Sequence, residues 1–337
     1  MTAFHTITVG RADDGTRLDR WFKSRFTNVG FTELQRLLRT GQVRVDGKRA
    51  KASHRLEAGQ EIRVPPYVQA GQRPDGSKAA KVDAAAHRAP PPVRDKDAEE
   101  LRARVIYRDD DMIVINKPAG LAVQGGTGTT RHLDAMLDAL RFDAEERPRL
   151  VHRLDRDTSG VLVLARHRRA AQALTLAFRA RDTRKIYLAI TVGVPRPHQG
   201  KIDLALGKAG GRGREKMVAD AEEPQRAVTL YAVMDTAAQR AALVSLMPLT
   251  GRTHQLRAHM EALGTPILGD GKYGGRESFI DGLDLAKTLH LHAYRLEIPK
   301  PSGGVLKVMA PLPDHLKHAI AAFGFDAKGE ADPFPRD

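Results

Sequence analysis

Residues 68–100 constrain the fold of this chain more than any other segment, because they cannot form a packed core. The segment, VQAGQRPDGSKAAKVDAAAHRAPPPVRDKDAEE, is rich in Ala, Pro, Gly and charged residues and nearly free of large apolar ones. Such a composition buries too little apolar surface to offset the entropy lost on folding. We therefore predict a flexible linker between a small domain, 1–67, and a larger one, 101–324. The polar, proline-bearing end, 325–337, is predicted to be a flexible tail.

The charge of the chain favours a polyanionic partner. Lys and Arg total 55 against 41 Asp and Glu, which gives a formal net charge of +14. The excess lies in the two domains, because the linker contains as many acidic as basic residues. A strongly basic protein binds nucleic acid or an anionic membrane surface readily, although a generally basic soluble protein has the same composition.

Cysteines, a signal peptide and membrane-span patterns are absent from the sequence. Without cysteine the chain has no thiol nucleophile, disulfide framework or cysteine zinc site. The N-terminus, MTAFHTITVGRADDG, has no basic segment followed by an apolar one, and no stretch approaches the roughly 18 apolar residues of a spanning helix. We expect a cytoplasmic protein without a membrane partner.

The small domain is predicted to contain two helices followed by a β-hairpin. Apolar residues recur at helical spacing in TRLDRWFKSRF and again in FTELQRLLRTG, where Gly41 ends the second helix. Val43 and Val45 then alternate with polar residues before a turn at Asp46-Gly47, and a second strand follows around EIRVP.

The order of RLDRWF, LQRLLRTGQVRVDGKRA and LEAGQEIRV resembles the S4 RNA-binding domain. The resemblance implies an RNA-binding face, to which we assign Arg39, Arg44 and Lys48. A generic small α/β module with a solvated basic face would show the same pattern without that function.

Short alternating strands dominate from residue 101 onward, as in RVIYRDDDMIVINKP, GVLVLARH, RKIYLAITVGV, RAVTLYAVM, RAALVSLMPL and LHLHAYRLEI. Helices are expected at about 168–180 and 253–263, with Thr253 as the N-cap and Gly264 as the C-terminal stop of the second. The sequence therefore predicts an α+β protein, in which a small α/β, S4-like domain precedes a mixed, mainly antiparallel sheet with flanking helices and loops.

One polar loop carries the densest cluster of reactive side chains. In LVHRLDRDTSGVLVLAR, Asp155 and Asp157 alternate with arginines between two predicted strands. A carboxylate beside cations stays ionised and can act as a nucleophile or base, although a charged surface hairpin explains such a run about as well. Motifs for nucleotide hydrolysis, dinucleotide binding and zincin chemistry are absent. The histidine pairs His254/His259 and His290/His292 lack partners for a metal site, so we interpret them as structural or RNA-facing.

The string HRLDRDTSG resembles the catalytic signature of the pseudouridine synthase family that includes the large-subunit ribosomal RNA enzymes, and this implies that Asp155 is the essential aspartate. Three further stretches agree with the family in order and spacing, namely NKPAGLAVQGG, RKIYLAI and PLTGRTHQLRAHMEALG. In the first, Gln124 stands where many members have histidine. Together with the S4-like module, KPAGLAVQGGTGT and VHRLDRDTSGVLVLAR are most similar to the C type of the large-subunit enzymes.

The resemblance also implies roles for side chains around Asp155. Tyr187 would stack on the uracil and take part in proton transfer, and Arg252 would pair with Asp155 through its guanidinium. Contacts with the substrate are expected from further residues of the same motifs: Lys117, His152, Arg153 and Leu256.

Membership of this family would make the chain an enzyme that isomerises uridines to pseudouridines in ribosomal RNA, in particular the 23S molecule of the large subunit. The N1–C1′ bond is broken and the uracil is rejoined through C5, which requires no metal, redox group or nucleotide cofactor. Attack of the carboxylate on C1′, its addition to C6 and removal of a proton from C2′ remain open as routes. Each needs an ionised aspartate.

Two other functions fit parts of the pattern. A non-catalytic, S4-type ribosome assembly factor would use the basic surface, but it would not require a carboxylate among phosphate-seeking cations. A glycoside hydrolase needs two suitably spaced acids, and the sequence does not show whether Asp157 faces the same site as Asp155.

Overall fold

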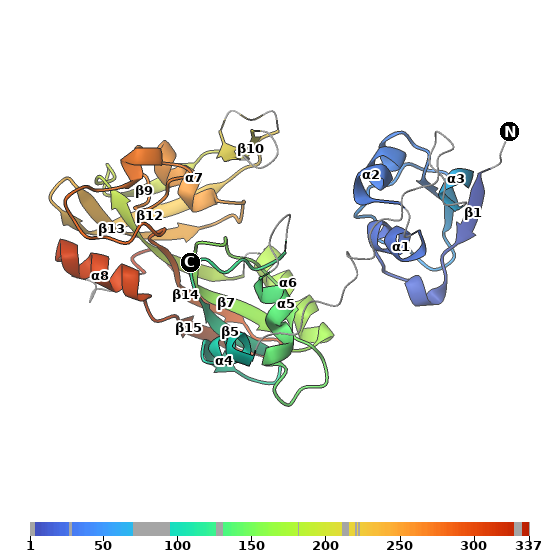
Figure 1. Ribbon diagram of the computed structural model, residues 1–337, viewed down its shortest axis with the longest axis horizontal. Coiled ribbons are helices and arrows are strands. Elements are labelled where there is room, and N and C mark those ends of the chain that lie inside the picture. The colour runs from blue at the N-terminus through green and yellow to red at the C-terminus, as the bar shows by residue number, and fades with distance from the viewer. Residues whose placement is uncertain are drawn as a thin grey trace. The chain divides into compact units, whose positions relative to one another are not determined.

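The structure is a computed structural model in which the chain forms two compact units, residues 1–91 and 92–337 (Figure 1). It describes residues 4–26, 29–69, 95–125, 131–180, 182–210, 216–219, 221, 223–326 and 332–336. Each unit has a hydrophobic core of its own and is described by itself.

The N-terminal unit contains, among its described residues, a three-stranded antiparallel sheet of order β1-β3-β2 and two main helices. Its elements are β1 (His5–Thr8), the 3₁₀ turn η1 (Arg11–Asp13), α1 (Leu18–Arg25), α2 (Phe31–Arg39), β2 (Arg44–Val45), β3 (Glu61–Val64) and α3 (Pro66–Gln69). The rings of Trp21, Phe22 and Phe26 pack together in the core. Asp46 and Gly47 have φ angles of 47° and 72°, as an Asp-Gly hairpin turn requires. The two helices and this turn lie where the sequence predicts them, whereas β1 was not predicted.

The larger unit alternates strands with short helices. Its first half contains α4 (Asp95–Arg102), β4 (Val105–Arg108), β5 (Met112–Lys117), α5 (Leu133–Met136), η3 (Leu137–Leu140), β6 (Arg149–Leu150), β7 (Ser159–Ala165), α6 (Arg168–Ala180) and β8 (Arg184–Val192). Its second half contains β9 (Gln199–Asp203), β10 (Gly207–Ala209), β11 (Lys216–Val218), β12 (Val228–Ala237), β13 (Ala241–Pro248), α7 (Gln255–Ala262), η4 (Gly275–Ser278), β14 (Leu291–Pro299), β15 (Val305–Met309) and α8 (Asp314–Phe323).

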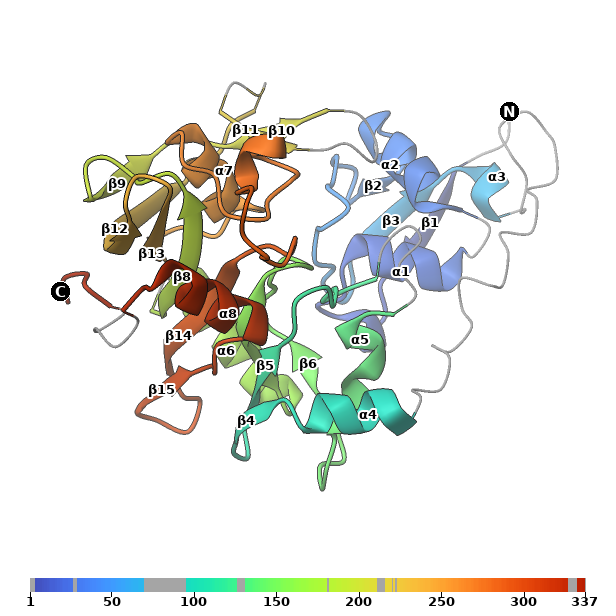
Figure 2. The ribbon, with the colours of Figure 1, turned by 60° about the vertical axis from the view of Figure 1, so that its left-hand side comes forward.

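Within the described residues of this unit, ten strands form one sheet with the main order β4-β5-β7-β14-β8-β13-β12-β9 (Figure 2). β6 pairs with β7, and β15 pairs with β14. The paired strands are antiparallel except β7 and β14, which run parallel. A separate antiparallel hairpin is formed by β10 and β11. The predicted mixed, mainly antiparallel sheet is therefore confirmed.

Strands β5 and β7 are buried on both faces, because successive side chains of a strand point to opposite sides. One face packs against α4, α5 and η3 through Ile113, Ile115, Leu162 and Leu164. The other packs against α6 through Met112, Val114, Val161 and Val163. The same division continues at β8 and β13, where α7 and α8 cover opposite faces of the sheet.

The parallel contact between β7 and β14 brings two backbones unusually close. Gly160 has a φ of +112°, and a Cβ at this position would clash with the backbone of Ala293 on β14. Only glycine fits this conformation and this space. The contact joins the two halves of the sheet and fixes the end of the loop 151–158, which precedes β7.

Helix α7 differs from the prediction at its start. It begins at Gln255, and its N-cap is His254, whose side chain makes no capping hydrogen bond. The proposed N-cap Thr253 is therefore wrong. Gly264, at φ +77°, follows the C-cap as expected.

The predicted linker, 68–100, overlaps helices at both of its described ends. α3 includes Val68, and α4 begins at Asp95 and buries Ala98 and Leu101, which lie on one helical face. Residues 70–94 lie outside the described residues.

The predicted flexible tail, 325–337, makes packing contacts through several of its described residues. Phe325 and Phe334 are buried, and the guanidinium of Arg184 donates hydrogen bonds to the carboxylate of Asp332 and to backbone carbonyls that follow it. The sequence of the segment does not reveal these contacts, because their partner, Arg184, lies on β8, far away along the chain. Residues 327–331 and 337 lie outside the described residues.

Candidate active site

A pocket of about 300 Å³ brings together most of the side chains that the sequence singled out. It is bordered by the loop 151–158, by β8 and by the loop 249–254 between β13 and α7. The predicted site residues that line it are His152, Arg153, Asp155, Tyr187, Arg252 and Leu256. The volume is at the lower end of the range typical of small-ligand pockets.

Asp155 presents a lone carboxylate to this pocket. Its Oδ1 lies 3.9 Å from Nε2 of His254, and each of the two side chains keeps 20% of its surface exposed. No other ion pair of Asp155 occurs among the described residues. The sequence interpretation set His254 aside as structural or RNA-facing, whereas the structure places it beside the aspartate.

Tyr187 approaches the same carboxylate from β8. Burial, and after it the negative charge of Asp155, raises the pKa of the phenol above its ordinary value. The hydroxyl therefore stays protonated at neutral pH and can donate a proton or a hydrogen bond. The ring packs against the two cores that border the pocket.

Arg252 lines the pocket but does not pair with Asp155, contrary to the prediction. Its Nε donates to the backbone carbonyl of Arg226 at 3.1 Å, and no ion pair between Arg252 and Asp155 occurs within the described ranges. Arg226 lies just before β12, so the Nε of Arg252 is bound by the backbone near the start of that strand.

Gln255 holds the loop that carries Arg252. Its Oε1 accepts from the hydroxyl of Thr250 at 2.7 Å and from the backbone N–H of Arg252 at 3.0 Å. Its Nε2 donates to the carbonyl of Val228 and to the hydroxyl of Thr229. This buried amide fixes the loop 249–254 against β12, and the sequence reasoning did not identify it.

A buried ion pair, which sequence reasoning also missed, begins at the wall of the pocket, which Arg257 lines. Arg257 donates two hydrogen bonds, of 2.8 and 2.7 Å, to the carboxylate of Asp270. Burial acts to lower the pKa of Arg257, but the hydrogen bond and charge of Asp270 outweigh it and raise that pKa. Removing one partner would leave an uncompensated buried charge, so the pair fixes α7 to the segment after it.

His152 borders the pocket, and one of its two ring nitrogens is occupied by the backbone. Nε2 accepts the backbone N–H of Val163 at 2.8 Å, and the ring stacks on Phe178 at 4.2 Å. Burial lowers the pKa of His152 to about 3, so the ring is neutral. It is part of the wall of the pocket, and its predicted role as a substrate ligand is not supported by these contacts.

Lys117 has a structural role in place of the predicted contact with the substrate. The side chain is fully buried, and its ammonium donates hydrogen bonds of 2.9 Å to the backbone carbonyls of Pro118, Leu121 and Arg156. Burial lowers its pKa to about 7, while the charges of Asp157 and Asp155 oppose this shift. Lys117 thus joins the segment after β5 to the loop that carries Asp155.

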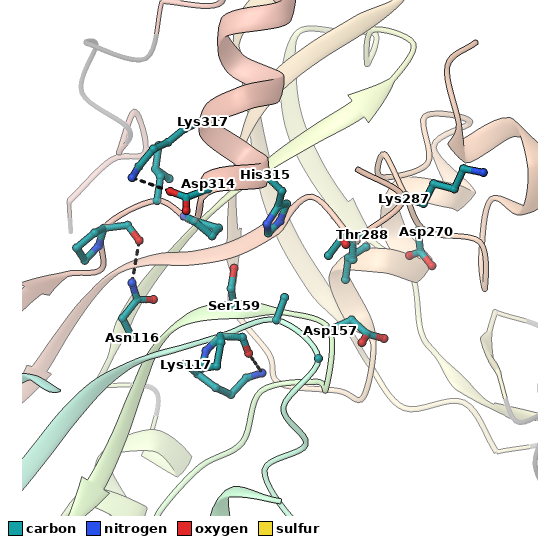
Figure 3. A pocket seen from close by; sticks show the side chains of 18 of the residues that line it. Asn116, Lys117, Asp157, Ser159, Asp270, Lys287, Thr288, Asp314, His315 and Lys317 are labelled. Atoms are coloured by element: carbon teal, nitrogen blue, oxygen red, sulfur yellow. Dashed lines mark hydrogen bonds and ion pairs between the residues drawn. The ribbon is translucent and has the colours of Figure 1, made fainter. Parts of the chain in front are cut away.

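A larger pocket, of about 890 Å³, lies on the other side of this loop and is lined by Asp157 and Ser159 (Figure 3). Several of its charges are paired within its own wall, such as Lys317 with Asp314 at 3.2 Å. Asp155 does not line it. We therefore assign the chemistry to the smaller pocket, which holds the lone carboxylate.

The basic residues predicted to bind RNA in the N-terminal unit differ in their surroundings. Arg39 and Lys48 are exposed. Arg44 is half-buried, and its guanidinium donates to the carbonyls of Gly41 and Gly47 at 3.1 and 2.9 Å. Arg44 therefore stabilises the turn.

The described residues offer neither a metal-binding cluster nor a membrane-spanning helix. Among them, no group of three or more His, Cys, Asp or Glu side chains is arranged to hold a metal ion. None of the helices that the structure describes is long and apolar enough to span a bilayer.

Comparisons with known proteins identify the family of the chain. The family model for RNA pseudouridylate synthase matches residues 111–262. The chain is 35% identical over 319 residues to the ribosomal large subunit pseudouridine synthase C of Escherichia coli O157:H7, which covers 93% of this chain and 95% of that protein. The protein of the same name from Pasteurella multocida is 33% identical over 323 residues, or 95% of this chain and 94% of that protein. The solved structure of human RNA pseudouridylate synthase domain containing 4 has a TM-score of 0.57 at 32% identity, and covers 67% of this chain and 95% of that chain.

Similarity at this level over nearly the whole of both chains shows common membership. The chain belongs to the RNA pseudouridylate synthase family. It is a pseudouridine synthase, and the expected similarity to the C type of the large-subunit enzymes is confirmed.

The structural role of Lys117 gives a testable prediction. Lys117→Met keeps the length of the side chain but leaves three backbone carbonyls without their donor, so we expect a loss of about 3 kcal/mol in the free energy of unfolding. The folded-state pKa of about 7 lies below the unfolded value of 10.5, so the unfolded chain binds more protons between these pH values. Stability from this group therefore rises with pH above 7, and the loss should be larger at pH 9 than at pH 7. Urea denaturation at the two pH values measures it.

Lys272→Met is the matched control, since Lys272 is exposed in the wall of the larger pocket. A Lys117→Met protein as stable as wild type at both pH values would show that the ammonium does not hold the loop.

Proposed function

We propose that this enzyme converts uridine to pseudouridine in the 23S ribosomal RNA of the large subunit, with Asp155 as the carboxylate that acts on the nucleotide. The observation that carries the proposal is the lone carboxylate at the pocket of about 300 Å³, beside a protonated tyrosine. The names of the two bacterial relatives, both ribosomal large subunit pseudouridine synthase C, support this substrate. A ribosomal RNA substrate also implies the cytoplasmic location that the sequence predicts.

The reaction is an isomerisation, and its atoms balance without a cofactor. The bond between N1 and C1′ breaks, the detached uracil turns within the pocket, and a bond forms between C5 and C1′. The proton on C5 is then released, while N1 takes up a proton. The part of Asp155 is to make and break a bond to the nucleotide or to remove a proton from the sugar, and either task needs the ionised form.

The target base must leave the RNA stack to reach Asp155, because C1′ and the uracil edges are hidden within a helix. Tyr187 offers an aromatic face and a hydroxyl that remains protonated. Arg153 is exposed at the rim of the pocket, where a cation would meet the phosphates that flank the base. Leu256 supplies an apolar surface to the wall. The guanidinium of Arg252 can turn toward the substrate only after its hydrogen bond to the carbonyl of Arg226 is broken.

The arrangement disfavours the alternative functions. A glycoside hydrolase requires two carboxyl groups that flank one bond, whereas Asp157 lines the larger pocket and Asp155 lines the smaller one. A purely RNA-binding assembly factor has no need of a carboxylate beside a protonated tyrosine in a pocket.

The N-terminal unit acts, in this proposal, as the S4-type RNA-binding module that the sequence predicts for residues 1–67, joined by a linker to the catalytic domain. Its helices, its hairpin turn and the exposed cations Arg39 and Lys48 support this assignment. The module would bind ribosomal RNA outside the target nucleotide and raise affinity through its link to the catalytic domain.

The catalytic assignment predicts that Asp155→Ala abolishes turnover while the protein still folds and binds RNA. Losing a carboxylate that makes and breaks bonds lowers the rate on the order of a million-fold. Losing one exposed charge weakens binding by about 1 kcal/mol or less. The measurement uses a ribosomal RNA fragment tritiated at uridine C5, with tritium release for turnover and filter retention for binding.

Asp157→Ala is the matched control, because it removes a carboxylate from the same loop but from the other pocket. We expect its rate to fall less than about tenfold. Substantial tritium release by the Asp155→Ala protein would remove Asp155 from the chemistry.

The RNA-binding assignment of the N-terminal unit is tested by the double variant Arg39→Glu and Lys48→Glu. If both cations contact phosphates, the log–log slope of affinity against salt should fall by about 1.4, at about 0.7 per contact. The same change of charge at the exposed Arg11 and Lys23 is the control. Equal salt slopes for wild type and the Arg39/Lys48 variant would contradict the assignment.

A further inference from the structure

We propose that His254 and Tyr273 form a positioning pair for Asp155, in which the hydroxyl of Tyr273 fixes the tautomer of His254 so that its Nε2–H faces the carboxylate. The inference rests on the proposed function, because it takes Asp155 as the reacting group. Neither residue was given a role by the sequence motifs.

Three polar groups lie in a row from the pocket inward. Asp155 Oδ1 is 3.9 Å from His254 Nε2, which is an electrostatic contact and too long for a hydrogen bond. On the far side of the same ring, Nδ1 lies 3.0 Å from the hydroxyl of Tyr273. The two rings meet edge to face, with centroids 5.6 Å apart at 86°. The imidazole is thus held at one nitrogen and presents the other to the aspartate.

The direction of each hydrogen bond follows from a third group. The backbone N–H of Met217 on β11 donates to the hydroxyl oxygen of Tyr273 at 3.0 Å. A backbone N–H can only donate, so it occupies one acceptor site of this oxygen. The hydroxyl proton still needs an acceptor, and Nδ1 of His254 is the one that the described residues place within hydrogen-bond distance, so we assign the hydroxyl as the donor to Nδ1. A neutral imidazole that accepts at Nδ1 carries its proton on Nε2. This is the nitrogen that faces Asp155.

Tyr273 is itself rigidly held. Its side chain is buried, its backbone N–H donates to Asp270 at 3.2 Å, and the guanidinium of Arg257 lies 5.0 Å from its ring centroid. Arg257 and Asp270 are the buried ion pair that begins at the wall of the pocket. The ion pair, through the tyrosine, therefore fixes the position of the hydroxyl that selects the tautomer.

The protonation state and the backbone conformation of His254 agree with this role. Burial lowers its pKa, the charges of Arg257 and Lys272 act in the same direction, and those of Asp155 and Asp270 oppose them. The ring is then neutral and supplies a polarised N–H without a second full charge. His254 also has a φ of +51°, an uncommon conformation for a residue other than glycine that costs free energy and aims the ring into the pocket.

The pair orients Asp155, whereas Arg252 forms no ion pair with that carboxylate among the described residues. A carboxylate on a loop turns about its side-chain bonds, and an N–H dipole of fixed direction favours one orientation of its oxygens. Asp155 would thereby be aimed before the nucleotide arrives, and such preorganisation of a reacting group raises the rate of the chemical step.

The tautomer is read directly by NMR of the full chain labelled with ¹⁵N-histidine, using two-bond proton–nitrogen correlations. The signals of His254 are those missing from the His254→Gln protein. We expect protonation at Nε2 and a hydrogen-bonded Nδ1 in wild type, and a shift of the Nδ1 resonance in Tyr273→Phe, which loses only the hydroxyl. A proton on Nδ1, or an Nδ1 resonance that Tyr273→Phe leaves in place, would overturn the proposal.

Single-turnover rates on the tritiated RNA fragment test the consequence for catalysis. Tyr273→Phe should lower the rate roughly 3- to 10-fold, the worth of one hydrogen bond, with RNA affinity unchanged. His254→Ala should lower it at least as much, and His254→Gln, whose amide N–H replaces Nε2–H, should recover part of the loss. Both variants face the same positive φ, so their difference reports on the side chain. In the His254→Ala background, Tyr273→Phe should have no further effect, since it acts through the histidine.

Tyr231→Phe is the matched control, because its buried hydroxyl donates to the Pro197 carbonyl and Tyr231 does not line the pocket. If Tyr273→Phe and His254→Ala both reacted at the wild-type rate while Asp155→Ala was inactive, the positioning pair would be rejected. The proposed function would then still stand. Turnover by Asp155→Ala would reject the proposed function itself.

Discussion

The close parallel contact between β7 and β14 is the constraint on which the site depends, because it joins the two halves of the sheet. Ala293 on β14 is registered with Gly160 on one side and with Tyr187 on the other. Gly160 lies at the start of β7, which follows the loop that carries Asp155. The paired residues Gly160, Ala293 and Tyr187 on three neighbouring strands therefore set the spacing between that loop and the tyrosine. A side chain at position 160 would separate the strands, and the carboxylate and the phenol would no longer share a pocket.

The fold was predictable wherever a strand or helix shows its own periodicity. β5, β7, β8 and β13 alternate or are apolar throughout, and α6 matches the expected 168–180. The grouping of Asp155, Tyr187 and Arg252 followed from the motifs alone. The hydrogen-bond partners of these side chains could not be predicted in this way. An arginine at position 252 can bind a carboxylate or, as observed, the backbone carbonyl of Arg226.

The differences between the predicted and observed site share one physical cause. A polar side chain in a motif can form hydrogen bonds with the backbone as well as with a substrate. Lys117 binds three carbonyls, and His152 accepts a backbone N–H of β7. Gln255 and Arg257 were present in the quoted motifs, but both have partners that lie outside those motifs and leave no periodic signal. Asp332 in the tail was missed likewise, since its partner, Arg184, is far away in the sequence.

Isomerisation of uridine in ribosomal RNA by an ionised Asp155 is tested most directly by mapping pseudouridines along the large-subunit RNA of cells that lack the gene. The cells are complemented with wild type or with Asp155→Asn, which keeps the shape of the side chain and removes its charge, at matched expression. We expect specific positions to lose pseudouridine on deletion, to regain it with wild type and to remain uridine with Asp155→Asn. Pseudouridine restored by Asp155→Asn, or no position lost on deletion, would contradict the assignment.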